Sequence, residues 1–149
     1  MDSLIYNSKI EVKKSPIHGY GVFAKENIKK GEILEECHFM SLPLPEKLSG
    51  LMDVSFYQST NIGRYYFLFP RLDRYNLLEE KIEKAEYILP FGTGCIYNSS
   101  PNANADWDTD IKKRLLIFKA IKDIEKGKEI FTNYELHLAW CKKINLIWK

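Results

Sequence analysis

Short runs in which apolar and polar residues alternate predict a chain built mainly of β-strands. Residues 9–14 alternate in this way, and Pro16 ends the run because proline donates no hydrogen bond to a β-ladder. Short strands separated by turn residues are typical of a mainly β fold with little helix. The predicted strands cover residues 9–14, 22–24, 33–37, 64–69, 114–121 and 127–134.

Helical periodicity is found in two segments. Residues 77–86 are compatible with a short helix whose charged residues form a solvated face. In residues 136–149, Leu136, Trp140 and Ile144 recur every four residues, which places them on one face of a helix. We expect this C-terminal helix to pack on the core. A role in dimer contact or in covering a substrate is the alternative.

Two segments far apart in the chain echo each other. Residues 28–31 read Ile-Lys-Lys-Gly, and residues 124–127 read Ile-Glu-Lys-Gly. We interpret Lys30-Gly31 as a turn that requires a residue in the left-handed conformation, which glycine adopts at no steric cost. One echo of this kind is weaker than the fixed period of a repeat array.

Length, charge and cysteine content exclude several classes of protein. The 149 residues fit one domain, and 22 Lys+Arg against 20 Asp+Glu leave a net charge of +2, which argues against direct nucleic-acid binding. No apolar stretch approaches a membrane span, and no secretory signal is expected. The scattered Cys37, Cys95 and Cys141 predict neither a disulfide framework nor a zinc site.

Three segments are candidates for chemistry. Residues 18–21, His-Gly-Tyr-Gly, allow close approach of the backbone to a ligand, although a tight hairpin is the alternative. Residues 97–105 have the composition of a surface loop, but their apolar flanks suggest that Asn98 and Asn104 are internal hydrogen-bonders that brace a loop or hold a polar ligand. Residues 127–135 form an alternating strand that ends in a tyrosine.

Taken in this order, the three segments resemble the SET-domain protein-lysine methyltransferases, most closely the small viral SET histone-lysine methyltransferases and small bacterial SET proteins. Residues 13–24 are similar to the first Gly-x-Gly motif of the family. Residues 98–105 are similar to its Asn-His-Ser-x-x-Pro-Asn-Ala motif. Gly127, Glu129, Ile130 and Tyr134 match Gly-x-Glu-(Ile/Leu)-x-x-x-Tyr.

The resemblance implies a mainly β, β-clip fold of small curved sheets, with short helices, a C-terminal pseudoknot and the C-terminal helix. It implies a single SET domain over residues 1–149. The clear match covers residues 9–37 and 92–135, whereas residues 38–91 form a divergent insert and residues 136–149 a helical tail.

The resemblance also implies S-adenosyl-L-methionine as the cofactor and methyl donor, and no metal. Tyr134 is the implied catalytic residue, because it should sit where the cofactor and the substrate lysine meet. The implied cofactor-binding residues are His18, Gly19, Tyr20, Gly21, Asn98, Ser99 and Tyr134. The implied residues of the substrate channel are Tyr20, Tyr97, Thr132, Leu138 and Trp140.

Departures from the family pattern bear on activity. Ser99 stands where the family usually has His, and Ala103 where it usually has Pro. Leu138 stands where the viral relatives carry a second Tyr, and Trp140 is the candidate to replace it. Thr132 occupies a position where many members use Phe or Tyr to limit the degree of methylation.

The function implied is transfer of a methyl group from S-adenosylmethionine to a lysine of a histone or another basic protein. The alternatives are a SET-fold module that binds peptide or cofactor with weak or no catalysis, and a different chemistry on a related β-clip scaffold. The expected partner is a protein with a target lysine, with no direct nucleic acid and no membrane. Small family members can dimerise to complete the site, so a homodimer is a further expectation. The expected location is intracellular: the host nucleus for a viral protein, the cytoplasm for a bacterial one.

Overall fold

The computed structural model describes residues 8–41, 67–69 and 86–133, which form three small β-sheets and contain no helix. None of these described residues therefore belongs to a helix that could cross a membrane. The strands are β1 (Ile10–Lys14), β2 (Tyr20–Ala24), β3 (Ile33–Cys37), β4 (Phe39–Ser41), β5 (Phe67–Phe69), β6 (Glu86–Pro90), β7 (Asn98–Ser99), β8 (Ala105–Asp110), β9 (Leu115–Ala120) and β10 (Glu129–Thr132).

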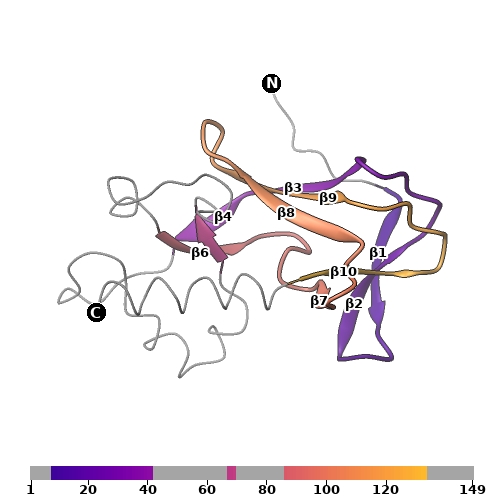
Figure 1. Ribbon diagram of the computed structural model, residues 1–149. Helices are drawn as coiled ribbons and strands as arrows, with labels where there is room; N and C mark the ends of the chain where they lie inside the picture. The colour runs from indigo at the N-terminus through magenta and orange to yellow at the C-terminus, as the bar shows by residue number, and fades with distance from the viewer. Residues whose placement is uncertain (1–7, 42–66, 70–85, 134–149) are drawn as a thin grey trace.

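The sheets meet along a long β8–β9 ribbon. The β3-β9-β8 sheet contains this ribbon, the β4-β6-β5 sheet lies at one end of it, and the β1–β2 hairpin lies at the other (Figure 1). The hairpin belongs to a four-stranded sheet of order β1-β2-β10-β7, which we call the hairpin sheet. In this sheet β10 and β7 pair in parallel, with Phe131 opposite Asn98 and Thr132 opposite Ser99. This parallel pair joins two segments that the sequence singled out as motifs.

Large aromatic side chains fill the space between the sheets. Trp107 on β8 and Phe118 on β9 are almost completely buried. Phe67 of β5 packs edge-on against both rings, with centroid distances of 4.9 Å to Trp107 and 6.1 Å to Phe118. Edge-to-face pairs of this kind contribute about 1 kcal/mol beyond the apolar area that they bury. The core therefore ties β5, from the segment predicted to be a divergent insert, to the ribbon.

The two echoing turns are partners in the structure. Ile28 and Ile124 form an antiparallel bridge in which each backbone N–H donates to the other's carbonyl at 2.8 Å. Gly31 and Gly127 have nearly equal positive φ values of 90° and 87°. The prediction that Gly31 supplies a left-handed turn residue is confirmed.

The strand ends around these turns are bonded in the same reciprocal way. Gly31 N donates to Ala120 O at 2.8 Å, and Gly127 N donates to Ala24 O at 2.8 Å. Each turn thus closes on the strand end that precedes the other turn. We call this pair of turns, residues 24–32 and 120–128, the double turn; it joins the hairpin sheet to the β3-β9-β8 sheet.

Most strand predictions are confirmed within one or two residues, and β3 is predicted at its observed bounds. Strands β4, β6, β7 and β8 are not predicted from the sequence, because residues 97–105 are interpreted as a loop and the segments of β4 and β6 have no clear alternation. In β8, Ala105, Trp107 and Thr109 alternate inward, but three aspartates between and after them disfavour a strand prediction. The helix predicted over residues 77–86 is wrong at Glu86, which begins β6, and the rest of it lies outside the described residues. The helix predicted over residues 136–149 and the pseudoknot path beyond residue 133 also lie outside them.

Replacing Gly31 or Gly127 by alanine is predicted to lower the free energy of unfolding by about 1–2 kcal/mol, the cost of a left-handed L-residue. Steric overlap is not the reason, because a Cβ at either position meets nothing within 4 Å. Urea unfolding measures the effect, and the two variants should lose similar amounts. Asparagine, which tolerates this conformation better, is the matched control. An alanine variant as stable as the unmutated protein would contradict the prediction.

Candidate functional site

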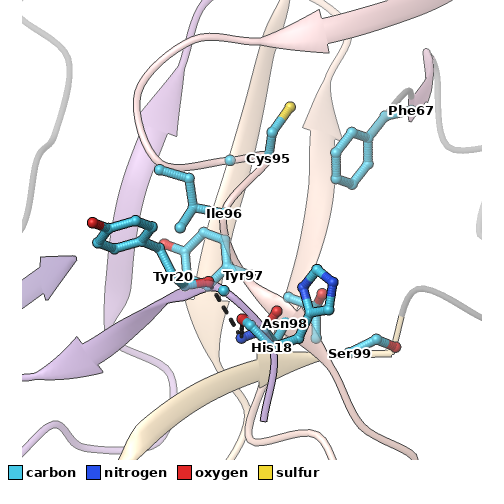
Figure 2. A pocket seen from close by; sticks show the side chains of 11 residues that line it. His18, Tyr20, Phe67, Cys95, Ile96, Tyr97, Asn98 and Ser99 are labelled. Atoms are coloured by element: carbon cyan, nitrogen blue, oxygen red, sulfur yellow. Dashed lines mark hydrogen bonds between the residues drawn. The ribbon is translucent and has the colours of Figure 1, made fainter. Parts of the chain in front are cut away.

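A cavity of about 490 Å³ lies between the β1–β2 hairpin and the segment that leads into β7. Residues 18–20 and residues 94–99 line it, together with Phe67 and Thr132. Figure 2 shows Tyr20 and Phe67 on opposite sides of this cavity. No acidic or basic side chain other than His18 lines it among the described residues. The pocket is therefore suited to a ligand held by shape, aromatic surface and backbone groups.

One carboxylate anchors the segments that surround the pocket. Glu129 of β10 is only 8% exposed. Ser15 Oγ donates to its Oε1 at 2.6 Å, and Asn98 Nδ2 donates to its Oε2 at 2.7 Å. A buried carboxylate requires such donors, because losing its hydration without replacement is costly. We call this set, Ser15, Asn98 and Glu129, the carboxylate brace.

The amide of Asn98 also fixes the backbone of the hairpin. Its Nδ2 lies 3.1 Å from His18 O and 3.3 Å from Tyr20 O, both of which can accept a hydrogen bond (Figure 2). One side chain of β7 therefore positions two carbonyls on either side of Gly19. The hairpin tip is held against β7 by these contacts, which gives the pocket a fixed edge.

Gly21 is required by the carboxylate brace. A Cβ at this position would lie 2.5 Å from Glu129 Oε2 and 3.0 Å from Asn98 Nδ2, closer than any ordinary contact. Gly19 has a different reason to be glycine, since its φ is +48° and a Cβ there would meet nothing within 4 Å. Gly19 therefore shapes the hairpin tip, and Gly21 lets the carboxylate brace approach β2.

Asn104 holds the other side of β10. Its Nδ2 donates to Glu129 O at 2.9 Å, and its Oδ1 accepts from Phe131 N at 2.8 Å. This pair of bonds replaces a neighbouring strand for the backbone of β10. The bracing role predicted for Asn98 and Asn104 is confirmed.

The structure brings most of the predicted site residues to one place. His18, Gly19, Tyr20, Tyr97, Asn98, Ser99 and Thr132 line the pocket. Gly21 lies beside it, at the brace. Tyr134, Leu138 and Trp140 lie outside the described residues, so their roles, like those of the lining residues, stay predictions. No group of three or more His, Cys, Asp or Glu in the described part of the chain could hold a metal ion.

Tyr97 has a second set of contacts that the sequence did not indicate. Its hydroxyl donates to Glu35 Oε1 at 2.8 Å, and its ring stacks on Phe118 at 4.6 Å. Burial, and then the negative charge of Glu35, raise the pKa of the Tyr97 hydroxyl well above its ordinary value. The hydroxyl therefore stays protonated and remains bonded to the carboxylate.

Sequence reasoning missed Glu35 because β3 contains a β-bulge. The register against β9 shifts between Ile33 and Glu35, so the adjacent Leu34 and Glu35 both point into the core. Strict alternation would place one of the two outside. Glu35 is 1% exposed, so its carboxylate lies in the core.

The substitution Gly21→Ala is predicted to lower the free energy of unfolding by about 2 kcal/mol, because the new methyl group displaces the Glu129 carboxylate from its two donors. In a Glu129→Ala background the nearest obstacle is gone and the tight approach to Asn98 Nδ2 remains, so the same substitution should cost less, about 1 kcal/mol. Urea unfolding of the four proteins of this double-mutant cycle measures the difference. Equal losses in both backgrounds would show that the brace does not require this glycine.

Cys95 offers a test of the pocket's polarity. Burial raises the pKa of its thiol to about 11. Only the thiolate reacts with alkylating reagents, so the alkylation rate of Cys95 should still rise between pH 8 and pH 10, whereas an exposed thiol of pKa about 8.5 levels off. Peptide mass spectrometry separates Cys95 from the other cysteines. A plateau below about pH 9 would contradict the buried environment.

Comparison with known proteins identifies the fold. A family model of the SET domain matches residues 19–135. The variant-silencing SET domain-containing protein of Plasmodium falciparum isolate 3D7 is 31% identical, over 91% of this chain and 5% of that protein. This chain thus corresponds to a small part of that curated relative.

Two solved structures have the same fold. A candidate histone methyltransferase of Plasmodium falciparum superposes with a TM-score of 0.58 at 29% identity, over 86% of this chain and 94% of that one. The Neurospora SET domain protein DIM-5, a histone lysine methyltransferase, superposes with a TM-score of 0.57 at 20% identity, over 84% of this chain and 51% of that one. The predicted mainly β SET fold is confirmed.

The source of these relatives differs from the prediction. They come from Plasmodium falciparum and Neurospora, and they do not support closest relatives among small viral and bacterial proteins. The family model nevertheless covers two of the three segments on which the resemblance rested and residues 19–24 of the first, and the three segments surround one pocket. This chain belongs to the SET domain family.

Proposed function

We propose that this protein is an S-adenosylmethionine-dependent protein-lysine N-methyltransferase whose cofactor site is the pocket beside the carboxylate brace. The observation that carries the proposal is the convergence of three family motifs on that pocket. The brace links β10 to β7 through Glu129 and Asn98, and Asn98 links β7 to the hairpin tip. The SET domain match and the methyltransferase neighbours support the same activity.

The pocket fits such a cofactor in size and character. Its volume of about 490 Å³ lies within the usual range for small-molecule sites. Gly19 gives the hairpin tip a face without a side chain, and the ring of Tyr20 is 60% exposed beside it. S-adenosylmethionine supplies an electrophilic methyl group on a sulfonium. We propose that the backbone of residues 18–20, with Asn98 and Ser99, would hold it.

The protein must also deliver a neutral lysine amine. A free lysine has a pKa of about 10.4, so deprotonation near pH 8 costs roughly 3 kcal/mol. A narrow aromatic channel lowers that pKa by desolvation and orients the amine, which makes positioning the main source of catalysis. Tyr20, Tyr97 and Thr132 are the described candidates for the channel wall. The Tyr97 hydroxyl already donates to Glu35, so its contribution would come from the ring.

Tyr134 is the proposed catalytic residue. It follows Thr132 of the pocket wall by two positions in the sequence, which supports a place near the mouth of the pocket. Its hydroxyl would orient the substrate amine and accept weak C–H hydrogen bonds from the polarised methyl group. Leu138 and Trp140 are proposed to close the channel from the tail.

The proposed substrate is a lysine of a histone tail or of another basic protein, at an intracellular location. The histone methyltransferase neighbours support this class. A homodimer that completes the channel is part of the proposal, as the family resemblance implies.

A catalytically weak binding module is the second candidate. Ser99 favours it, because this residue lines the pocket where the family usually has His. A SET fold with a weakened cofactor site could hold a basic peptide without transferring a methyl group. The two candidates differ in turnover, so a transfer assay separates them.

The test uses the unmutated protein and Tyr134→Phe. Calorimetry should detect S-adenosylmethionine binding, and labelled methyl transfer to histones should fall about a hundredfold in the variant, as for loss of one positioned polar group in an active site. Tyr87→Phe, on strand β6, which contributes no described residue to the pocket lining, is the matched control and should retain activity. Binding without transfer would favour the module. No cofactor binding at all would favour a different chemistry on this scaffold.

A further inference from the structure

Glu35 is a buried carboxylate that forms no ion pair with a cationic side chain in the part of the chain that the structure describes. It is 1% exposed on β3. The ion pairs found among the described residues, Lys9 with Glu32 and Lys13 with Glu11, are elsewhere. A carboxylate in the core is costly unless hydrogen bonds replace its hydration. The donors that satisfy Glu35 are therefore held firmly to it.

These donors come from both ends of one short segment. Thr93 donates to Glu35 from its hydroxyl, at Oε1, and from its backbone N–H, at Oε2 and 3.3 Å. Tyr97 donates from its hydroxyl to Oε1 at 2.8 Å. The residues between them, Gly94, Cys95 and Ile96, all line the pocket, as does Tyr97. One carboxylate thus pins the two ends of a pocket wall.

The same segment is shaped for this contact. Gly92 has a φ of +76°, and a Cβ there would lie 2.9 Å from Glu35 Oε2. Ile96 N donates to Thr93 O at 2.8 Å and closes a turn above the carboxylate. The turn therefore approaches Glu35 with its backbone and faces the pocket with its other side.

From this geometry we infer that Glu35 is a positioning residue for the pocket wall formed by residues 94–97. It does not line the cavity, and it acts through Thr93 and Tyr97. The inference rests on the proposed function in one respect: it expects that a pocket whose wall is no longer held by Glu35 binds S-adenosylmethionine less tightly. The wall itself is a property of the protein without ligand.

The test removes single hydroxyl donors. Tyr97→Phe keeps the ring that stacks on Phe118 and deletes its hydroxyl, and Thr93→Val deletes the other hydroxyl. Thr109→Val is the matched control, because Thr109 is also buried but lies on β8, away from the pocket. All three variants lose a hydroxyl, and only the first two act on Glu35.

Amide hydrogen exchange of the protein without ligand is the first measurement. The Ile96 amide, which closes the turn, should exchange about tenfold faster in Tyr97→Phe and in Thr93→Val, as expected for loss of one hydrogen bond. In Thr109→Val the Ile96 amide should exchange at the same rate as in the unmutated protein, with the amides of β8 and β9 as the reference. Unchanged exchange in the two wall variants, or the same increase in all three, would overturn the inference.

Titration with S-adenosylmethionine is the second measurement. Dissociation constants about tenfold weaker in the two wall variants, with that of Thr109→Val unchanged, support the inference. Equal affinity in all variants assigns Glu35 to stability alone and overturns it. If the unmutated protein fails to bind, the proposed function fails, and the exchange measurement still decides whether Glu35 positions the wall.

Discussion

The carboxylate of Glu129 is the interaction on which the rest of the site depends. It is buried, so both of its oxygens need donors, and these come from Ser15 in the loop of the β1–β2 hairpin and from Asn98 on β7. Glycine at position 21 lets the Glu129 carboxylate approach β2, because a Cβ there would overlap it. One ion thus fixes three segments that lie far apart in the chain, and the pocket is the space that they leave between them.

A second carboxylate follows the same logic on the other side of the pocket. Glu35 is surrounded by neutral donors, Thr93 and Tyr97, as Glu129 is by Ser15 and Asn98. Both ions lie outside the cavity, whose own lining is largely neutral. Charge in this protein therefore organises the walls, and the pocket surface is left to glycine backbone, aromatic rings and small polar groups. That division suits a reaction in which positioning supplies most of the catalysis.

The sequence predicted much of this arrangement where the signal was local. The turn at Gly31 and its echo at Gly127 follow from glycine conformation, and the bracing by Asn104 follows from polar residues between apolar flanks. Reciprocal bonding of the two turns could not be predicted, because it depends on how two sheets meet. The inward direction of Glu35 was equally hidden, since a β-bulge sets it. The family resemblance supplied what periodicity cannot, which is the link between the motifs and a cofactor.

The pocket beside the carboxylate brace is proposed to be the S-adenosylmethionine site. Titration of the isotope-labelled protein with this compound, followed by amide NMR shifts, tests this proposal directly. We expect the largest shifts at the amides of Gly19, Tyr20, Asn98 and Ser99, all of them saturating with one binding constant. No shifts at these amides, or shifts centred on residues 108–112 at the far end of the ribbon, would contradict the proposal.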